Sequence, residues 1–178
     1  HGVSGGVTVT TDQGSEHFDR VVLATHSDQA LTLLRDASAA ECQTLGAIRY
    51  HPNIAVLHTD TTVLPRHPRA WAAWNYESAA ADPTSAGTDG HAVCLHYLLN
   101  RLQPLPWQQP VLVSLNPLRA IREKHVLGQY RYAHPVFDRT AIAAQQQMQT
   151  LQGQSNTYYC GAWMGYGFHE DGLKAGLE

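Results

Sequence analysis

The chain has 178 residues, 43% of them hydrophobic, so it can bury one sizeable core. Its 12 Lys and Arg residues stand against 15 Asp and Glu, and no basic run gathers on one segment, which argues against a nucleic-acid partner. No apolar run approaches the roughly 20 residues of a membrane span and no signal-peptide pattern is present, so we expect no transmembrane segment and a cytoplasmic location.

The first fifty residues predict a hairpin, a strand and two short helices. Alternating Val and Thr precede a turn at residues 12–14, and the apolar run 21–24 follows the return strand, so we expect a hairpin that leads into a buried strand. Ser27 and Asp28 are candidate caps of a helix over residues 29–36. Ser38 and Glu41 have the spacing of a capping box before a second helix.

From Arg49 onward the chain becomes rich in β-forming segments. Pro, Gly, Asp and Ser clusters separate these segments, which favours an antiparallel or mixed sheet. The segments are residues 49–60, 70–78, 91–102, 110–117 and 125–137. Residues 78–90 predict a long surface loop, and residues 138–152 predict a helix closed by Gly153. A strand over 157–163 and a helix starting at 169 complete an α+β fold.

The C-terminal stretch YYCGAWMGYGFHEDGLKAGLE, residues 158–178, combines glycines and aromatic residues with an acidic helix start. The unpaired N–H groups of a helix N-terminus can stabilise a ligand oxygen that gains negative charge. Glycines allow the backbone to approach closely, and Trp163, Tyr166 and Phe168 offer rings to a planar ligand. A plain strand-loop-helix connection, with glycines for turns and aromatics for the core, is the alternative interpretation.

A family resemblance rests on several of these motifs. GFHEDGLKAG, residues 167–176, is similar to the C-terminal flavin-contacting segment of the flavin-containing amine oxidase superfamily, which includes phytoene desaturase-like and protoporphyrinogen oxidase-like enzymes. FDRVVLATH, residues 18–26, resembles the strand that leads from the FAD domain toward the substrate domain. With YHPNIAVLHTD, NRLQPL and GYGFHEDG, nearly the whole chain resembles the bacterial predicted NAD/FAD-binding oxidoreductases of that superfamily.

The resemblance implies FAD as cofactor and a set of contacting residues. The backbone N–H of His169 or Glu170 would face the flavin pyrimidine oxygen, and Phe168 with Trp163 would line the substrate cage beside the ring. Gly161 matches the glycine that ends the last FAD-domain strand. Many relatives carry an acidic residue directly after it, so Ala162 implies no side-chain contact there. The remaining implied cofactor contacts are Ala24, Thr25, Ala162 and Gly167.

The FAD cradle of the family, a strand-turn-helix with G-x-G-x-x-G, has no counterpart in the sequence. We therefore expect the C-terminal part of a flavoenzyme, inactive by itself and without tight FAD binding. Residues 1–26 would belong to the FAD domain, 27–152 to the substrate domain, and 153–178 to the last FAD-domain strand and helix start. Neither Lys124 nor Lys174 matches the lysine near flavin N5 in amine oxidases, so hydride transfer from a small-molecule substrate is the broader expectation. No catalytic residue is assigned.

Other constellations carry less weight. The histidine pairs His51/His58 and His91/His96 are separated by odd numbers, so each pair points to opposite strand faces, and we expect no metal site. A nucleophile next to a base, as in Cys94 and His96, is a weak hydrolase signal. Three widely spaced cysteines predict buried free thiols. Polar-aromatic positions that can line a pocket are Arg49, Tyr50, Trp71, Trp74, Tyr76, Tyr97, Asn100 and Arg101.

A non-enzymatic binding or assembly module is the alternative function. A chain without the nucleotide-binding half would expose apolar faces, and such faces tend to pair with another copy. A homodimer formed through these surfaces is therefore a further expectation.

Overall fold

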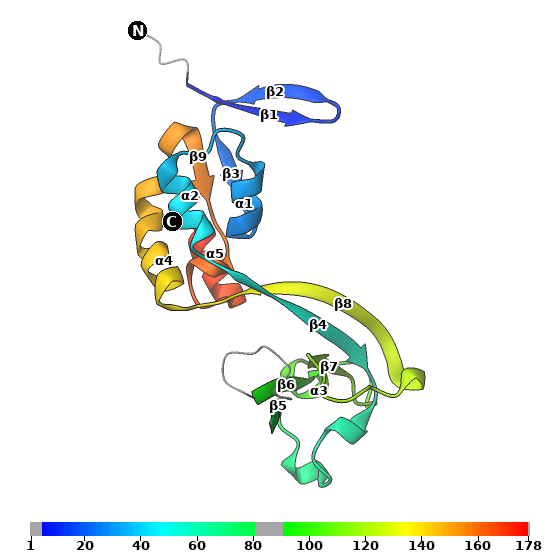
Figure 1. Cartoon of the computed structure of the whole chain (residues 1–178). Coiled ribbons are helices and arrows are strands. Elements are labelled where there is room, and N and C mark those ends of the chain that lie inside the picture. Colours follow the sequence, from blue (N-terminus) through cyan, green and yellow to red (C-terminus); the bar gives the residue numbers. More distant parts are fainter. Residues whose placement is uncertain (1–4, 81–90, 178) are drawn as a thin grey trace. The chain divides into compact units, whose positions relative to one another are not determined.

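The computed structural model of the chain describes residues 5–80 and 91–177 (Figure 1). Contacts between Cα atoms divide it into two compact units. We call His1–His51 with Pro135–Glu178 the helical unit, and Pro52–His134 the sheet unit. The predicted boundaries at 26 and 152 concern functional parts rather than contacts, and they stay a prediction.

Two small sheets belong to the helical unit. β1 (Val7–Thr11) and β2 (Gly14–Phe18) form the predicted antiparallel hairpin, and β3 (Val21–Leu23) pairs in parallel with β9 (Thr157–Tyr159). The prediction that the strand after the hairpin is buried is wrong, because Val22 is 61% exposed. β9 is its only partner in the described part of the chain, so one face of this two-stranded sheet stays open.

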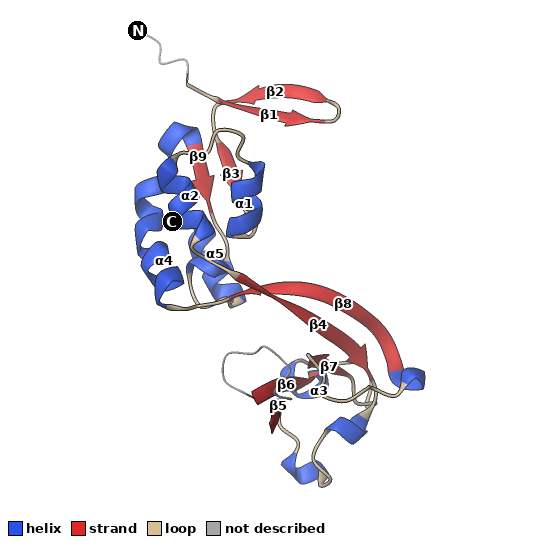
Figure 2. Cartoon of the chain, viewed as in Figure 1, coloured by secondary structure: helices blue, strands red, loops and turns tan. Residues whose placement is uncertain are grey.

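Four helices accompany these strands, as Figure 2 shows by colour. They are α1 (Ser27–Leu33), α2 (Ala39–Gly46), α4 (Arg139–Leu151) and α5 (His169–Leu177).

The helix ends follow the predicted signals in all but one case. The capping box of α2 is present, since Ser38 Oγ accepts the N–H of Glu41 and the Glu41 carboxylate accepts the N–H of Ser38 at 2.7 Å. α4 ends just before Gly153, whose φ of 75° is left-handed as a glycine there allows. The cap of α1 is His26 rather than Ser27 or Asp28, because the helix begins at Ser27 itself.

One hydrogen-bonded polar pair lies in the core of the helical unit. The apolar core residues are Ala30, Leu45, Ile48, Ala141, Ala144, Met148, Leu151, Tyr159 and Trp163. Among them the Tyr159 hydroxyl donates to the Glu41 carboxylate at 2.6 Å. Burial raises the pKa of Glu41, but hydrogen bonds from Tyr159 and Ser38 outweigh burial, so the pKa lies below its usual value.

The sheet unit is built on five strands in the order β5-β6-β7-β4-β8. β5 pairs with β6, β6 with β7, and β7 with β4, each in antiparallel orientation, which confirms the predicted antiparallel or mixed sheet. The strands are β4 (Tyr50–His58), β5 (Trp74–Ala80), β6 (His91–Leu98), β7 (Leu112–Leu115) and β8 (Val126–Pro135). Short helices lie between them at Thr61–Val63, Pro68–Ala70, Leu99–Leu102 (α3) and Glu123–His125.

Several smaller expectations have mixed outcomes. Of the predicted loop 78–90, residues 78–80 belong to β5 and the rest lies outside the described residues. Cys94 is buried, but Cys160 is half-buried and Cys42 is exposed, so the prediction of three buried thiols is wrong. Cys42 lies on the short amphipathic helix α2, where a side chain faces solvent on one side. None of the helices within the described ranges is long and apolar enough to cross a membrane.

Candidate functional site

The ends of β3 and β9 bring four of the predicted cofactor residues together. The N–H of Cys160 donates to the carbonyl of Leu23 at 3.2 Å. Because the strands are parallel, their carboxyl ends meet at one edge, where open α/β sheets bind ligands. The residues that follow the strands at this edge are Ala24, Thr25, Gly161 and Ala162.

Gly161 allows the indole of Trp163 to reach across this edge. A Cβ on Gly161 would lie 2.5 Å from Nε1 of Trp163, which real Cβ atoms do not tolerate. The indole N–H donates to the carbonyl of Thr25 at 2.8 Å, and Trp163 is only 3% exposed. Trp163 therefore contributes to the core, and its predicted place in a substrate cage stays a prediction.

The loop before α5 is folded around a carboxylate. Oδ2 of Asp171 accepts the N–H of Tyr166 at 3.1 Å and that of Phe168 at 2.9 Å. A Cβ on Gly165 would lie 2.5 Å from Oδ1 of Asp171, so only glycine fits against it. Gly167 has a φ of 87°, and its N–H donates to the carbonyl of Ala162 at 3.0 Å. These contacts connect the loop to the end of β9.

This wrapping leaves two backbone donors at the start of α5. The N–H groups of His169 and Glu170 make no hydrogen bond within residues 5–80 and 91–177, and both side chains are exposed. Phe168 is 59% exposed. A helix N-terminus with two unpaired donors and a partial positive charge can receive a ligand oxygen that carries negative charge. The residues at this edge therefore fit one end of a planar, anionic-capable ligand.

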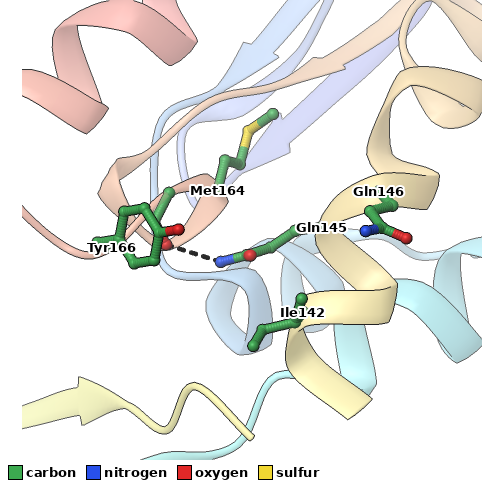
Figure 3. Close-up of a pocket in the computed structure, with 6 residues that line it drawn as sticks. Ile142, Gln145, Gln146, Met164 and Tyr166 are labelled. Atoms are coloured by element: carbon green, nitrogen blue, oxygen red, sulfur yellow. Dashed lines mark hydrogen bonds between the residues drawn. The ribbon is translucent and has the colours of Figure 1, made fainter. Parts of the chain in front are cut away.

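A shallow cavity of about 380 Å³ lies beside the loop in the helical unit. Figure 3 shows the side chain of Gln145 reaching from α4 to the loop, where it donates to the carbonyl oxygens of Trp163 at 2.8 Å and Gly165 at 2.7 Å. These bonds attach the loop to α4. The cavity is lined by Ile142, Gln145, Gln146, Met164, Gly165 and Tyr166.

In the sheet unit, three of the predicted pocket residues come together on one face. Trp74 is opposite Tyr97, their rings meet edge to face at 5.3 Å, and Tyr76 is opposite Leu95. Trp74 is 51% and Tyr76 68% exposed. No charged side chain interrupts this face over the described parts of β5, β6 and β7. We call it the outer face, and its residues are Trp74, Tyr76, Ser78, Val93, Leu95, Tyr97, Val113 and Leu115.

Four of the other predicted pocket positions have structural partners instead. Arg49 pairs with Asp138 at 2.8 Å, and Tyr50 stacks on His26 with ring centroids 4.5 Å apart. The Trp71 indole donates to the carbonyl of Pro65. The amide of Asn100 bonds the main chain at Gln109 and Val111. Arg101, the last position, is an exposed residue of α3.

The opposite, inner face carries a polar cluster that sequence reasoning missed. Ser114 Oγ lies 2.7 Å from Nε2 of His58 and 2.6 Å from Nδ1 of His96, whose Nε2 lies 3.0 Å from Glu77. The two histidines come from different strands, so spacing within one strand carried no signal of their proximity. No group of three or more His, Cys, Asp and Glu suited to a metal occurs in the described part of the chain.

Cys94 lies against His96, with Sγ 3.5 Å from Nε2, so this pair is close in space as well as in sequence. Burial raises the pKa of Cys94 to about 11, which keeps the thiol protonated near neutral pH. The pair therefore lacks the thiolate that a nucleophilic cysteine needs.

Comparison with known proteins relates this architecture to two flavoenzyme-like folds. No protein-family model and no curated protein matches the chain. A CLA-producing fatty acid isomerase from P. acnes matches 97% of this chain with a TM-score of 0.58 and 16% identity. A candidate protoporphyrinogen oxidase from Exiguobacterium sp. 255-15 matches 98% of it with a TM-score of 0.52 and 12% identity. The chain spans 43% of the length of either protein.

At these identities the comparisons establish the fold. The α+β class is confirmed, and the predicted resemblance to the flavin-containing amine oxidase superfamily, with its protoporphyrinogen oxidase-like members, is confirmed at the level of the fold.

Proposed function

We propose that this chain is the C-terminal part of an FAD-dependent oxidoreductase that transfers a hydride from an organic substrate to flavin. One observation carries the proposal: the carboxyl ends of β3 and β9 are linked through Gly167 and Ala162 to a helix start with two unpaired N–H groups. The fold that the chain shares with a protoporphyrinogen oxidase-type protein supports it.

The residues at this edge would contribute mainly backbone. The N–H of His169 or Glu170 would donate to the flavin pyrimidine oxygen, and Phe168 would lie against the ring. Ala24, Thr25, Gly161, Ala162 and Gly167 would let the ligand approach the main chain. FAD, when bound, supplies the hydride acceptor. The sequence has no G-x-G-x-x-G cradle, so these residues would hold only one end of the cofactor.

The outer face of the sheet unit is the proposed substrate surface. Its aromatic rings and the absence of charge among its described residues suit a neutral or mainly apolar small molecule. The fold neighbour from P. acnes is described as a fatty acid isomerase, which agrees with an apolar substrate class. The cytoplasmic location and a homodimer through exposed apolar surfaces belong to the same proposal.

Flavin binding by the protein at its natural length, measured by visible absorbance after purification without added cofactor, tests the proposal. A yellow protein is the expected result. His169→Pro removes one proposed donor while keeping a residue that the first helical position tolerates, so FAD affinity should fall by about 10-fold. Arg139→Pro, at the first position of α4, is the matched control and should bind FAD normally. A protein that stays colourless even after refolding with FAD would favour the binding or assembly module.

The substrate surface has a separate test in this chain. Titration with a long-chain alcohol and with the matching alkylamine, followed by tryptophan fluorescence, should give similar affinities because no described charge lies on the outer face. Trp74→Ala should abolish binding, whereas Trp107→Ala, an exposed tryptophan away from this face, should not. Preference for the amine, or binding that survives Trp74→Ala, would contradict the proposed substrate class.

A further inference from the structure

We propose that the buried chain of hydrogen bonds His58–Ser114–His96–Glu77 is an acid-sensitive crosslink that holds the sheet unit closed near neutral pH and releases it in mild acid. This inner crosslink spans four neighbouring strands. Glu77 lies on β5, His96 on β6, Ser114 on β7 and His58 on β4. Its existence does not depend on flavin or substrate.

The direction of every hydrogen bond in the inner crosslink follows from one backbone amide. The N–H of Asp60 donates to Nδ1 of His58 at 3.0 Å, so Nε2 carries the proton and donates to Ser114 Oγ at 2.7 Å. The serine hydroxyl then donates to Nδ1 of His96 at 2.6 Å. Nε2 of His96 donates in turn to the Glu77 carboxylate at 3.0 Å. Both rings are therefore neutral and in the Nε2–H form.

Water has little access to replace these bonds. His58 and Ser114 are 0% exposed and His96 is 1% exposed. Only the far end is open, where the Glu77 side chain is 31% exposed and pairs with Arg119 at 3.3 Å. A buried polar group that loses its partner keeps the full cost of its desolvation.

An added proton on His58 disrupts this order. A proton on Nδ1 would face the N–H of Asp60, which places two donors against each other. The Asp60 carboxylate would attract the charge, but Arg122 already binds both its oxygens at 2.6 and 2.9 Å. His96 on β6 and His125 at the end of the short helix 123–125 oppose a positive charge, and Cys94 beside His96 is a neutral thiol. The nearest uncommitted carboxylate, Glu77, lies beyond His96.

The sign of the pH effect follows from these surroundings. Burial lowers the pKa of His58 from 6.5 to about 4, so the unfolded state binds the proton more tightly. The stability that neutral His58 provides is complete above about pH 6.5 and is lost as the pH falls toward 4. At pH 5 the opening equilibrium of the sheet unit should be about 30-fold larger than at pH 7.5.

The inner crosslink also supports the outer face. His96 and Cys94 point inward from β6, whereas Val93, Leu95 and Tyr97 alternate with them on the other side. Opening the sheet in acid would therefore disassemble the outer face and release an apolar ligand. This last consequence rests on the proposed function, whereas the crosslink does not.

Two measurements on the full chain test the crosslink. Nitrogen-15 NMR of the imidazoles at pH 7.5 should find His58 and His96 neutral and protonated on Nε2. Hydrogen exchange, corrected for its intrinsic pH dependence, should detect the 30-fold increase in opening at pH 5 in residues 52–60, 91–98 and 111–116. The helical unit should change less than about 3-fold over the same range.

Variants separate the crosslink from general acid sensitivity. His58→Gln cannot take up a proton, so its opening should change less than about 3-fold between pH 7.5 and 5. His67→Gln, an exposed histidine of the same unit, should keep the full 30-fold change. The proposal is overturned if His58→Gln keeps the full change, or if His58 in the folded wild-type protein titrates near 6.5. The wild-type titration decides the matter even if His58→Gln does not fold.

Discussion

The two units bury their polar groups in opposite chemical forms. In the helical unit the buried group is an ionised carboxylate, Glu41, held by Tyr159 and by the capping box of its own helix. In the sheet unit the buried groups are neutral imidazoles joined through Ser114 across strands. A stabilised carboxylate resists acid until low pH, whereas a buried neutral imidazole is vulnerable in mild acid. The comparison teaches that one chain can contain two units with different acid thresholds.

Removal of Ser114 should have the largest effect. Ser114→Ala leaves Nε2–H of His58 and Nδ1 of His96 without partners in a dry environment, which should destabilise the sheet unit by about 2 to 4 kcal/mol. Urea unfolding with hydrogen exchange in β4, β6 and β7 measures the loss. Ser78→Ala, an exposed serine on the neighbouring outer face, should change stability by less than about 0.5 kcal/mol. Equal effects of the two variants would contradict the role of Ser114.

Tyr159→Phe should have the next largest effect, and it acts on the other unit. The variant removes the hydroxyl that donates to Glu41 and should cost about 1 to 2 kcal/mol. The neighbouring Tyr158→Phe is the control, because no hydrogen bond of its hydroxyl is found in the described residues. Exchange protection of α2 and β9 should fall in the first variant alone. A loss in the sheet unit would mean that the two polar centres are coupled.

Acid titration should separate the units without any substitution. The pKa of Glu41 in the folded chain lies below its usual 4.5, so its contribution is present above pH 4.5 and is lost only as the pH falls further. The helical unit should therefore keep its stability between pH 6.5 and 4.5, where the sheet unit loses stability. Hydrogen exchange at several pH values measures both units in one sample. Simultaneous loss of protection in both units at pH 5 would remove the distinction.

The smallest effect belongs to the loop before α5. Asp171→Asn weakens the acceptor for the N–H groups of Tyr166 and Phe168, so the loop should lose about 1 kcal/mol of local stability. Amide exchange of these two residues is the measurement. Glu170→Gln, which removes only an exposed pair with Lys174 at 3.9 Å, should leave their exchange unchanged. If both variants behave alike, Asp171 does not organise the loop.

Local signals predicted most elements of the fold. The capping box at Ser38 and the left-handed Gly153 are determined by neighbouring residues, so sequence was sufficient to locate both helix ends. The burial of Val22 depends on what covers its strand, and no local pattern contains that information. Exposure of Cys42 likewise depends on how α2 packs.

The candidate site divides in the same way. The family resemblance supplied Gly161, Gly167 and the helix start at His169, but it did not supply Asp171. The spacing of Phe168 and Asp171, three residues apart at a helix start, is a capping signal that could have indicated this contact. The inner crosslink was beyond sequence reasoning, because its register is set by pairing between distant strands.

The different exposure of two cysteines makes the wild-type chain its own kinetic probe. Cys42 lies at the surface of the helical unit, whereas Cys94 is 0% exposed and touches His96 in the inner crosslink. A thiol reagent should therefore modify Cys42 directly and Cys94 only during opening of the sheet. The ratio of the two alkylation rates, followed by mass spectrometry as the pH is lowered, reports how often the sheet unit opens without any engineered label.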